Sequence, residues 1–400
     1  MDQPVPKATL GRLRALIRQI AAATDSQMLR ILATVESAAD RREADALISP
    51  MRPRLNVLRP PRRLRIRRLI FYPLDPLILP PHRWRPGMPS IPRSILAPVA
   101  EAITASMPDT VARVEALLAD RTTADMGLIR ATGSVIWPGA AAALDSASPP
   151  ASWRDTGLAA VHYRTLAPAM AALLRQAAAI ETLILSALPG LLPPPTDAGH
   201  AILRGVEGEH PRALPALFVL LMMRLPDPAA LFALPRGDPL TPRLSAARAE
   251  AAGFLLERIG REGADAWVAG GSLAEAAETV RRLLVLLTQI DRTGATALRP
   301  ACRTLRHALD RACRLRFEAG VLTEMLPALA RDPPDAEHLE ATAFGLALFQ
   351  AEAREAGGKH TYDAALGTLA TAIRRHTSGT LAARLTEILL GTDAALGVLG

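Results

Sequence analysis

Residues 52–93 read RPRLNVLRPPRRLRIRRLIFYPLDPLILPPHRWRPGMPSIPR. This segment holds 11 arginines and ten prolines but a single acidic residue, Asp75, so its formal charge is +10. The whole chain of 400 residues carries +8, which means that everything outside the segment sums to −2. Positive charge concentrated in this way creates a local field that attracts anionic partners.

The prolines of the same segment limit its backbone conformation. A proline every four residues or so forbids a long helix, so we expect an extended arm with at most one short helix over 62–72. Large apolar residues accompany the arginines, and a disordered tail would not carry so many of them. We therefore predict an ordered arm whose apolar end at 77–79 packs on the helical body, with its arginines at the edges over 59–68 and 83–93.

The composition of the whole chain favours helices. Half of the residues are apolar and only 4% are aromatic. Alanine, leucine, arginine and glutamate lose little side-chain freedom in a helix, while the residue types that suit strands are scarce. The sequence thus predicts an all-α protein, an irregular multi-helix assembly with the Pro/Arg-rich extended arm at about 52–93.

A solenoid-like arrangement of the helices is left open. Residues 325–353, MLPALARDPPDAEHLEATAFGLALFQAEA, resemble a HEAT-type helical pair, with a proline-containing turn between two apolar-periodic runs. A solenoid needs several copies at a fixed period, and no second copy is found. An irregular helical array remains the expectation.

Four regions follow from changes in composition and periodicity. They are an N-terminal helical hairpin at 1–50, the basic arm at 51–93, a helical region at 94–190 and a C-terminal helical region at 196–400. The proline-rich tract at 191–196 marks the boundary between the last two regions.

Several helix ends are predicted from local signals. Ser106 is predicted to cap a helix whose first turn contains Pro108. A second helix is predicted to end at 137–139 (Trp-Pro-Gly), and a third is predicted to start at Pro168. Ser272 and Glu275 form the capping-box pattern. The helix that follows has a heptad-like apolar stripe, made of Leu273, Ala277, Val280, Leu284 and Leu287.

The search for catalytic and metal-binding motifs finds none that passes. Cys302 and Cys313 are 11 residues apart in one predicted helix, too far to pair, and are expected to be buried in a reducing compartment. No histidines stand at metal-ligand spacing. The sequence at 357–361 (Gly-Gly-Lys-His-Thr) resembles the end of a phosphate-binding loop but has His360 where a serine or threonine is needed. No metal and no cofactor is therefore predicted.

A second basic face, formed by Arg299, Arg303, Arg306 and Arg314, contains Asp310, so a salt-bridged solvated face is the favoured interpretation.

No apolar run is long and uncharged enough to span a bilayer, and the N-terminus lacks a signal-peptide core. We expect a cytoplasmic location. Peripheral membrane contact is less favoured, because polybasic lipid binders usually adjoin a free amphipathic helix or a lipid anchor.

The arm is the remaining candidate for a functional site. Guanidinium groups bind phosphates in forks and stack on aromatic faces, so we expect an anion-binding surface, with nucleic acid as the first partner to test. The predicted residues are Arg59, Arg62, Arg63, Arg65, Arg67, Arg68, Arg83, Trp84 and Arg85. One alternative is a helical scaffold or protein–protein adaptor in which the arm is structural and its arginines pair with acids of the helical body. Another is a helical enzyme without a readable motif.

Overall fold

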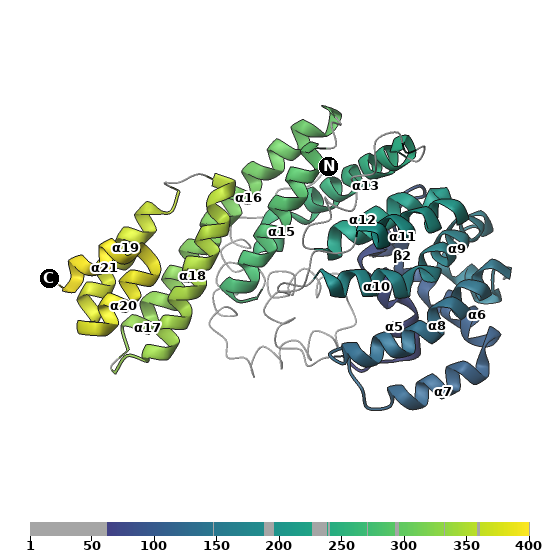
Figure 1. Ribbon diagram of the computed structural model, residues 1–400, viewed down its shortest axis with the longest axis horizontal. Helices are drawn as coiled ribbons and strands as arrows, with labels where there is room; N and C mark the ends of the chain where they lie inside the picture. The colour runs from purple at the N-terminus through teal and green to yellow at the C-terminus, as the bar shows by residue number, and fades with distance from the viewer. Residues whose placement is uncertain are drawn as a thin grey trace, which may run out of the picture. The chain divides into compact units, whose positions relative to one another are not determined.

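A computed structural model describes residues 62–399 apart from 147, 188–195, 226–237, 239–240, 270, 293–295, 332 and 358–360. The predicted hairpin at 1–50, the start of the arm with Arg59, and most of the tract at 191–196 lie outside the described residues. The prediction of an all-α multi-helix fold is confirmed (Figure 1). The described chain divides into two compact units.

The first unit comprises Pro61–Arg258 and Val285–Cys302. Its shorter elements are α5 (Ile66–Phe71), the 3-10 helices η2 (Tyr72–Leu77), η3 (Pro81–Arg83), η4 (Arg93–Ile95), η5 (Ala151–Thr156), η6 (Pro211–Ala213) and η8 (Thr296–Leu298), and the strands β1 (Ile78–Leu79) and β2 (Ile91–Pro92). Its longer helices are α6 (Leu96–Ser106), α7 (Pro108–Leu118), α8 (Met126–Ser146), α9 (Ala160–Arg175), α10 (Ala177–Ser186), α11 (Thr196–Glu209), α12 (Leu214–Arg224) and the greater part of α13 (Thr241–Glu262).

The second unit comprises Ile259–Leu284 and Arg303–Gly400. Its helices are α14 (Ala264–Val268), α15 (Leu273–Arg292), α16 (Arg299–Gly320), the π-helical turn η9 (Val321–Met325), α17 (Leu326–Leu329), α18 (Ala336–Gly357), α19 (Asp363–His376), α20 (Gly379–Leu390) and α21 (Thr392–Leu399). Helices α13, α15 and α16 contribute residues to both units.

The apolar residues of the arm belong to the core of the first unit. Leu69, Ile70, Leu74 and Leu77 are completely buried, and α5 packs on α8 and α6 while η2 packs on α12. Burial of a leucine or isoleucine side chain contributes about 1.5–3 kcal/mol. The apolar residues Leu74, Leu77 and Leu79 are thus packed inside this chain, with Ile78 partly exposed.

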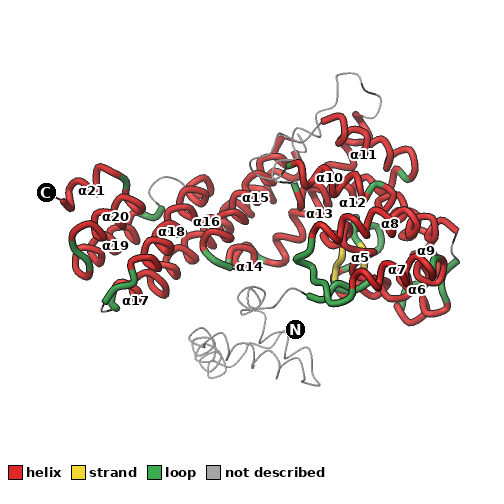
Figure 2. The backbone as a smooth tube through the Cα atoms, turned by 60° about the horizontal axis from the view of Figure 1, so that its bottom comes forward, coloured by secondary structure: helices red, strands yellow, loops and turns green. Residues whose placement is uncertain are grey.

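Two very short strands hold the two halves of the arm together. Ile78 pairs with Ile91 and Leu79 with Pro92 in a parallel register, shown in yellow in Figure 2. Gly87, in the connection between them, has φ +87°, a left-handed conformation that glycine adopts without strain. Arg93 directly follows β2 and begins η4.

Helix α12 is apolar on all sides because it is surrounded by other helices. All nine residues from Leu214 to Met222 are buried. Among the described helices none, taken singly, has the length and apolarity needed to cross a bilayer; α9 and α10 reach them only as a pair, bent by 51°.

Close approach of helices characterises the second unit. A Cβ atom added to Gly320 of α16 would lie 3.2 Å from side-chain carbons of Leu273 and Leu346, so α15, α16 and α18 meet at this point. The predicted capping box starts α15: the Ser272 N–H donates to Glu275 Oε2 (2.8 Å) and the Glu275 N–H donates to Ser272 Oγ (3.3 Å). The apolar stripe predicted for α15 is buried as expected.

Three helix ends differ from the sequence-based expectations. Ser106 does not cap α7; it is the last residue of α6, and its hydroxyl donates back to the Ile103 carbonyl (2.8 Å). Pro138 lies inside α8, and Pro168 lies inside α9, which begins at Ala160. Tertiary packing of both helices outweighs the lost backbone hydrogen bond.

Candidate anion-binding surface

The backbone of residues 62–64 is held in place by a neighbouring loop. The Leu64 N–H donates to the Arg121 carbonyl (2.8 Å), and the Thr123 N–H donates to the Arg62 carbonyl (2.9 Å), with an antiparallel bridge between Arg63 and Thr122. These bonds involve only main-chain atoms. Main-chain bonds to the neighbouring loop therefore help to fix the conformation of the segment.

Along this segment the apolar side chains are buried and most of the arginine side chains are exposed. Leu64 and Ile66 are buried, whereas Arg62, Arg63, Arg65 and Arg67 are exposed. The apolar residues thus fix the segment to the core and leave four guanidinium groups in solvent. We call the group of Arg62, Arg63, Arg65, Arg67, Arg68 and Arg93 the basic surface.

Arg68 connects the members of this surface. It is partly buried, and its Nη1 donates to the Arg63 carbonyl (3.3 Å). Burial lowers the pKa of the Arg68 guanidinium, and the positive charges of Arg62, Arg65 and Arg67 lower it further, while Asp75 acts in the opposite direction. A guanidinium in a field of like charge favours an added anion.

Asp75 is the acidic residue within this field. The residue keeps an exposed face, yet neighbouring chain removes part of the water around its carboxyl group, which raises the pKa of Asp75. The charges that act against this rise are those of Arg68, Arg224, Arg93 and Arg62. Arginines from three separate parts of the chain therefore surround one carboxylate.

The exposed arginines differ from others in the same unit in having no acidic partner. Arg175, Arg204 and Arg243 each form ion pairs with acids of another element. Within the part of the chain that the structure describes, the side chains of Arg62, Arg63, Arg65 and Arg67 form no ion pair. The expectation that the arm's arginines pair with acids of the helical body gains no support at these four positions.

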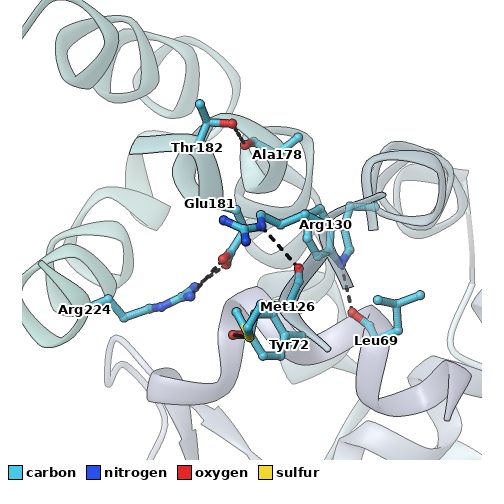
Figure 3. Close-up of polar contacts among 9 residues, drawn as sticks. Leu69, Tyr72, Met126, Arg130, Ala178, Glu181, Thr182 and Arg224 are labelled. Carbon is cyan, nitrogen blue, oxygen red and sulfur yellow. Dashed lines mark hydrogen bonds and ion pairs between the residues drawn. The ribbon is translucent and has the colours of Figure 1, made fainter. Parts of the chain in front are cut away.

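A buried polar network lies beneath the basic surface (Figure 3). Arg224, at the end of α12, donates both of its terminal nitrogens to Glu181 of α10, one of them at 2.9 Å to Oε2. Glu181 is only 3% exposed and the Arg224 side chain 15%. The Arg224 guanidinium also lies over the Tyr72 ring, 5.4 Å from its centroid. Arg224 is thereby occupied inside the protein and is not available to an external ligand.

Two further contacts fix the same region. The Tyr72 hydroxyl lies 3.4 Å from the Met126 sulfur, and Arg130 Nε donates to the Met126 carbonyl (3.2 Å). Burial raises the pKa of the Tyr72 hydroxyl, which keeps it protonated. The network positions η2, and with it Asp75, relative to α8 and α12.

Trp84 makes internal contacts rather than standing free between its two arginines. Its indole N–H donates to the Ser90 carbonyl (3.0 Å), and its ring meets the edge of His162 at a centroid distance of 5.7 Å. Trp84 is half-buried, whereas Arg83 and Arg85 on either side are exposed. The contacts of Trp84 thus lead to the start of α9.

Sequence reasoning missed three residues that belong to this region. Arg93 lies within the arm, but only the fold shows that it acts on Asp75, and Arg224 is brought in by the packing of α12 on η2. Arg121, 61% exposed, lies beside the segment through the main-chain bridge and forms only a long pair with Asp125 (3.9 Å). No local sequence signal marks these long-range neighbours.

The structure adds little support for the other candidate sites considered in the sequence analysis. Three residues of the phosphate-loop-like motif, at 358–360, lie outside the described residues. Arg314 of the second basic face pairs with Asp310 (3.3 Å), as the salt-bridged interpretation expects. No cluster of three or more potential metal ligands occurs among the residues that the structure describes.

Comparisons with known proteins identify no relative of this chain. No protein-family model, no curated protein and no solved structure matches this chain. The class that the observations define is an all-α multi-helix protein.

Proposed function

We propose that this chain is a non-enzymatic interaction protein that holds a polyanionic partner, in the first instance nucleic acid, on its basic surface. The observation that carries the proposal is the segment with Arg62, Arg63, Arg65 and Arg67. Main-chain hydrogen bonds hold its backbone, its apolar side chains are buried, and its four guanidinium groups are exposed and have no acidic partner among the described residues. Pre-positioned guanidinium groups bind phosphates at a small entropic cost.

Salt dependence gives the sharpest test. Phosphate contacts release counterions, so the logarithm of the binding constant falls with the logarithm of salt concentration by about 0.7 per contact for a single strand. The probe is a labelled single-stranded RNA oligomer, titrated with wild type and with a four-arginine variant, in which Arg62, Arg63, Arg65 and Arg67 are replaced by alanine. We expect the variant to bind weakly, with a slope smaller by about 3.

A matched control removes the same charge elsewhere in the first unit. Arg113, Arg154, Arg164 and Arg212 are also exposed, and their joint replacement by alanine changes the net charge equally. The control should keep most of the affinity and the slope. Equal losses in both variants would indicate a general charge effect, and absence of salt-dependent binding by wild type would overturn the proposal.

A second candidate function is that of a protein–protein adaptor, and exposed apolar residues in the second unit favour it. Phe344 and Leu348 lie one turn apart on α18, and Phe344 is 63% exposed; Leu322 in η9 is 62% exposed. Gly320 and Leu346, two residues from Leu322 and Phe344 respectively, are in close approach, so the two exposed side chains belong to neighbouring parts of packed helices.

Paired variants test this second candidate. A Leu322→Ser and Phe344→Ser double variant should lose proteins captured by the wild type, while Leu117→Ser, equally exposed on α7, should retain them. Identical capture by all three proteins would remove the adaptor function from this surface.

A further inference from the structure

The basic surface contains one residue whose charge opposes the proposed function. Asp75 is the single acid in 52–93, and η2 presents it at an exposed position while its neighbours Leu74 and Leu77 are buried. Helix α5 packs against η2, and Arg68, Arg93 and Arg62 lie near enough to act on the Asp75 carboxylate.

The carboxylate is surrounded by arginines but not locked to any of them. Among the described residues Asp75 forms no ion pair within 4 Å, although Arg68, Arg224, Arg93 and Arg62 all act on it electrostatically. Arg224 is already bound to Glu181. The arginines left to meet an external phosphate near Asp75 are therefore Arg62, Arg68 and Arg93.

An anion at this position would meet attraction and repulsion together. A small anion that reaches only Arg62, Arg68 and Arg93 feels the full repulsion of Asp75. A chain of phosphates also reaches Arg63, Arg65 and Arg67, and the additional contacts offset the repulsion. We infer that Asp75 is the specificity-determining residue of the basic surface, and that it makes the surface select extended polyanions over small phosphate ligands.

This inference rests on the proposed function and deepens it by naming the class of ligand. The test uses the full-length protein with Asp75→Asn, which removes the charge at nearly constant shape. The Ile78 N–H donates to the Asp75 main-chain carbonyl, and the substitution preserves this bond. Asp155→Asn, exposed on η5, is the control for a general loss of one negative charge.

Two probes separate the ligand classes. Pyrophosphate should bind wild type weakly and bind the Asp75→Asn variant about threefold to tenfold more tightly, the effect of one unit charge a few ångströms away near water. The RNA oligomer should gain by a smaller factor. The Asp155→Asn control should match wild type with both probes.

Acidic pH offers an independent check on the same residue. As pH falls through the pKa of Asp75, which lies above the ordinary aspartate value, the wild-type carboxylate becomes neutral. The difference in affinity between wild type and Asp75→Asn should then close, because the arginines that face Asp75 keep their charge and the Tyr72 hydroxyl, whose pKa burial raises, stays protonated.

The possible failures are distinguishable. If wild type binds the RNA oligomer with a steep salt slope but Asp75→Asn matches it with both probes, the role of Asp75 is overturned and the proposed function stands. If the variant gains more for RNA than for pyrophosphate, selection of extended polyanions is wrong. If wild type does not bind RNA at all, the proposed function fails, and this inference fails with it.

Discussion

The indole N–H of Trp137 in α8 donates to the main-chain carbonyl of Leu69 in α5 at 2.9 Å, and both residues are completely or almost completely buried. The bond joins the basic arm to α8. Among the described helices that lie entirely in the first unit, α8 is the longest. It explains why a segment with so many prolines and arginines is nevertheless held in one conformation.

Replacing Trp137 with phenylalanine tests this anchor. We expect a loss of about 2–4 kcal/mol in the free energy of unfolding, because the hydrogen bond is lost and the smaller ring leaves a cavity. The Leu69 carbonyl still accepts from the Tyr72 N–H, which limits the cost. Denaturant unfolding measures the change.

Trp84→Phe is the matched control for Trp137. Its indole also donates to a main-chain carbonyl, that of Ser90 (3.0 Å), but the side chain is half-buried. It should therefore cost about 1 kcal/mol. A cost for Trp137→Phe no larger than for Trp84→Phe would show that the arm is not anchored through α8.

The Glu181–Arg224 pair predicts strong coupling. Glu181→Leu alone leaves the Arg224 charge in a site with little water, and removal of one partner of a buried pair costs about 3–5 kcal/mol. The double variant Glu181→Leu with Arg224→Met should be less destabilised than Glu181→Leu alone. A double-mutant cycle in denaturant measures the coupling, and additive effects would contradict it.

Part of this structure could be predicted from local sequence signals. The all-α class follows from composition, and the Ser272–Glu275 capping box works as predicted because its bonds join residues three apart. The burial of Cys302 and Cys313 is also as expected. These features depend on neighbours along the chain, which a sequence displays directly.

The errors have one physical origin. Pro138 and Pro168 were expected to end or begin helices, but α8 and α9 pack against each other and continue through them. Arg224, likewise, reaches Tyr72 only because α12 packs on η2. Local propensity is a weak guide where tertiary packing supplies more free energy than one proline costs.

Burial of Cys313 in α16, in the second unit, gives a further prediction. Burial and the nearby Asp310 carboxylate raise the pKa of the Cys313 thiol to about 12. At mildly alkaline pH its thiolate fraction is therefore on the order of 10³ lower than that of a free cysteine, and the thiol should react with iodoacetamide only after unfolding. Alkylation followed by mass spectrometry, in native buffer and in denaturant, measures this; rapid native labelling of Cys313 would contradict its burial.

The thermal stability of the four-arginine variant distinguishes two roles of these arginines: binding an external ligand, or stabilising the fold through ion pairs. Where arginines hold helices together through ion pairs, their removal lowers the melting temperature. Burial is the largest cause of the lowered pKa of Arg68, and repulsion from Arg62, Arg65 and Arg67 lowers it further. Relief of that repulsion should raise the melting temperature by about 1–2 °C at low salt, and the gain should vanish at high salt.

The control with alanine at Arg113, Arg154, Arg164 and Arg212 should show no comparable gain, because those arginines are not the ones that act on Arg68. Differential scanning fluorimetry at two salt concentrations makes the comparison. A four-arginine variant that melts well below wild type, with RNA affinity unchanged, would assign the arginines to the stability of the fold. Equal or higher stability together with lost RNA binding is the result that only a ligand-binding role produces.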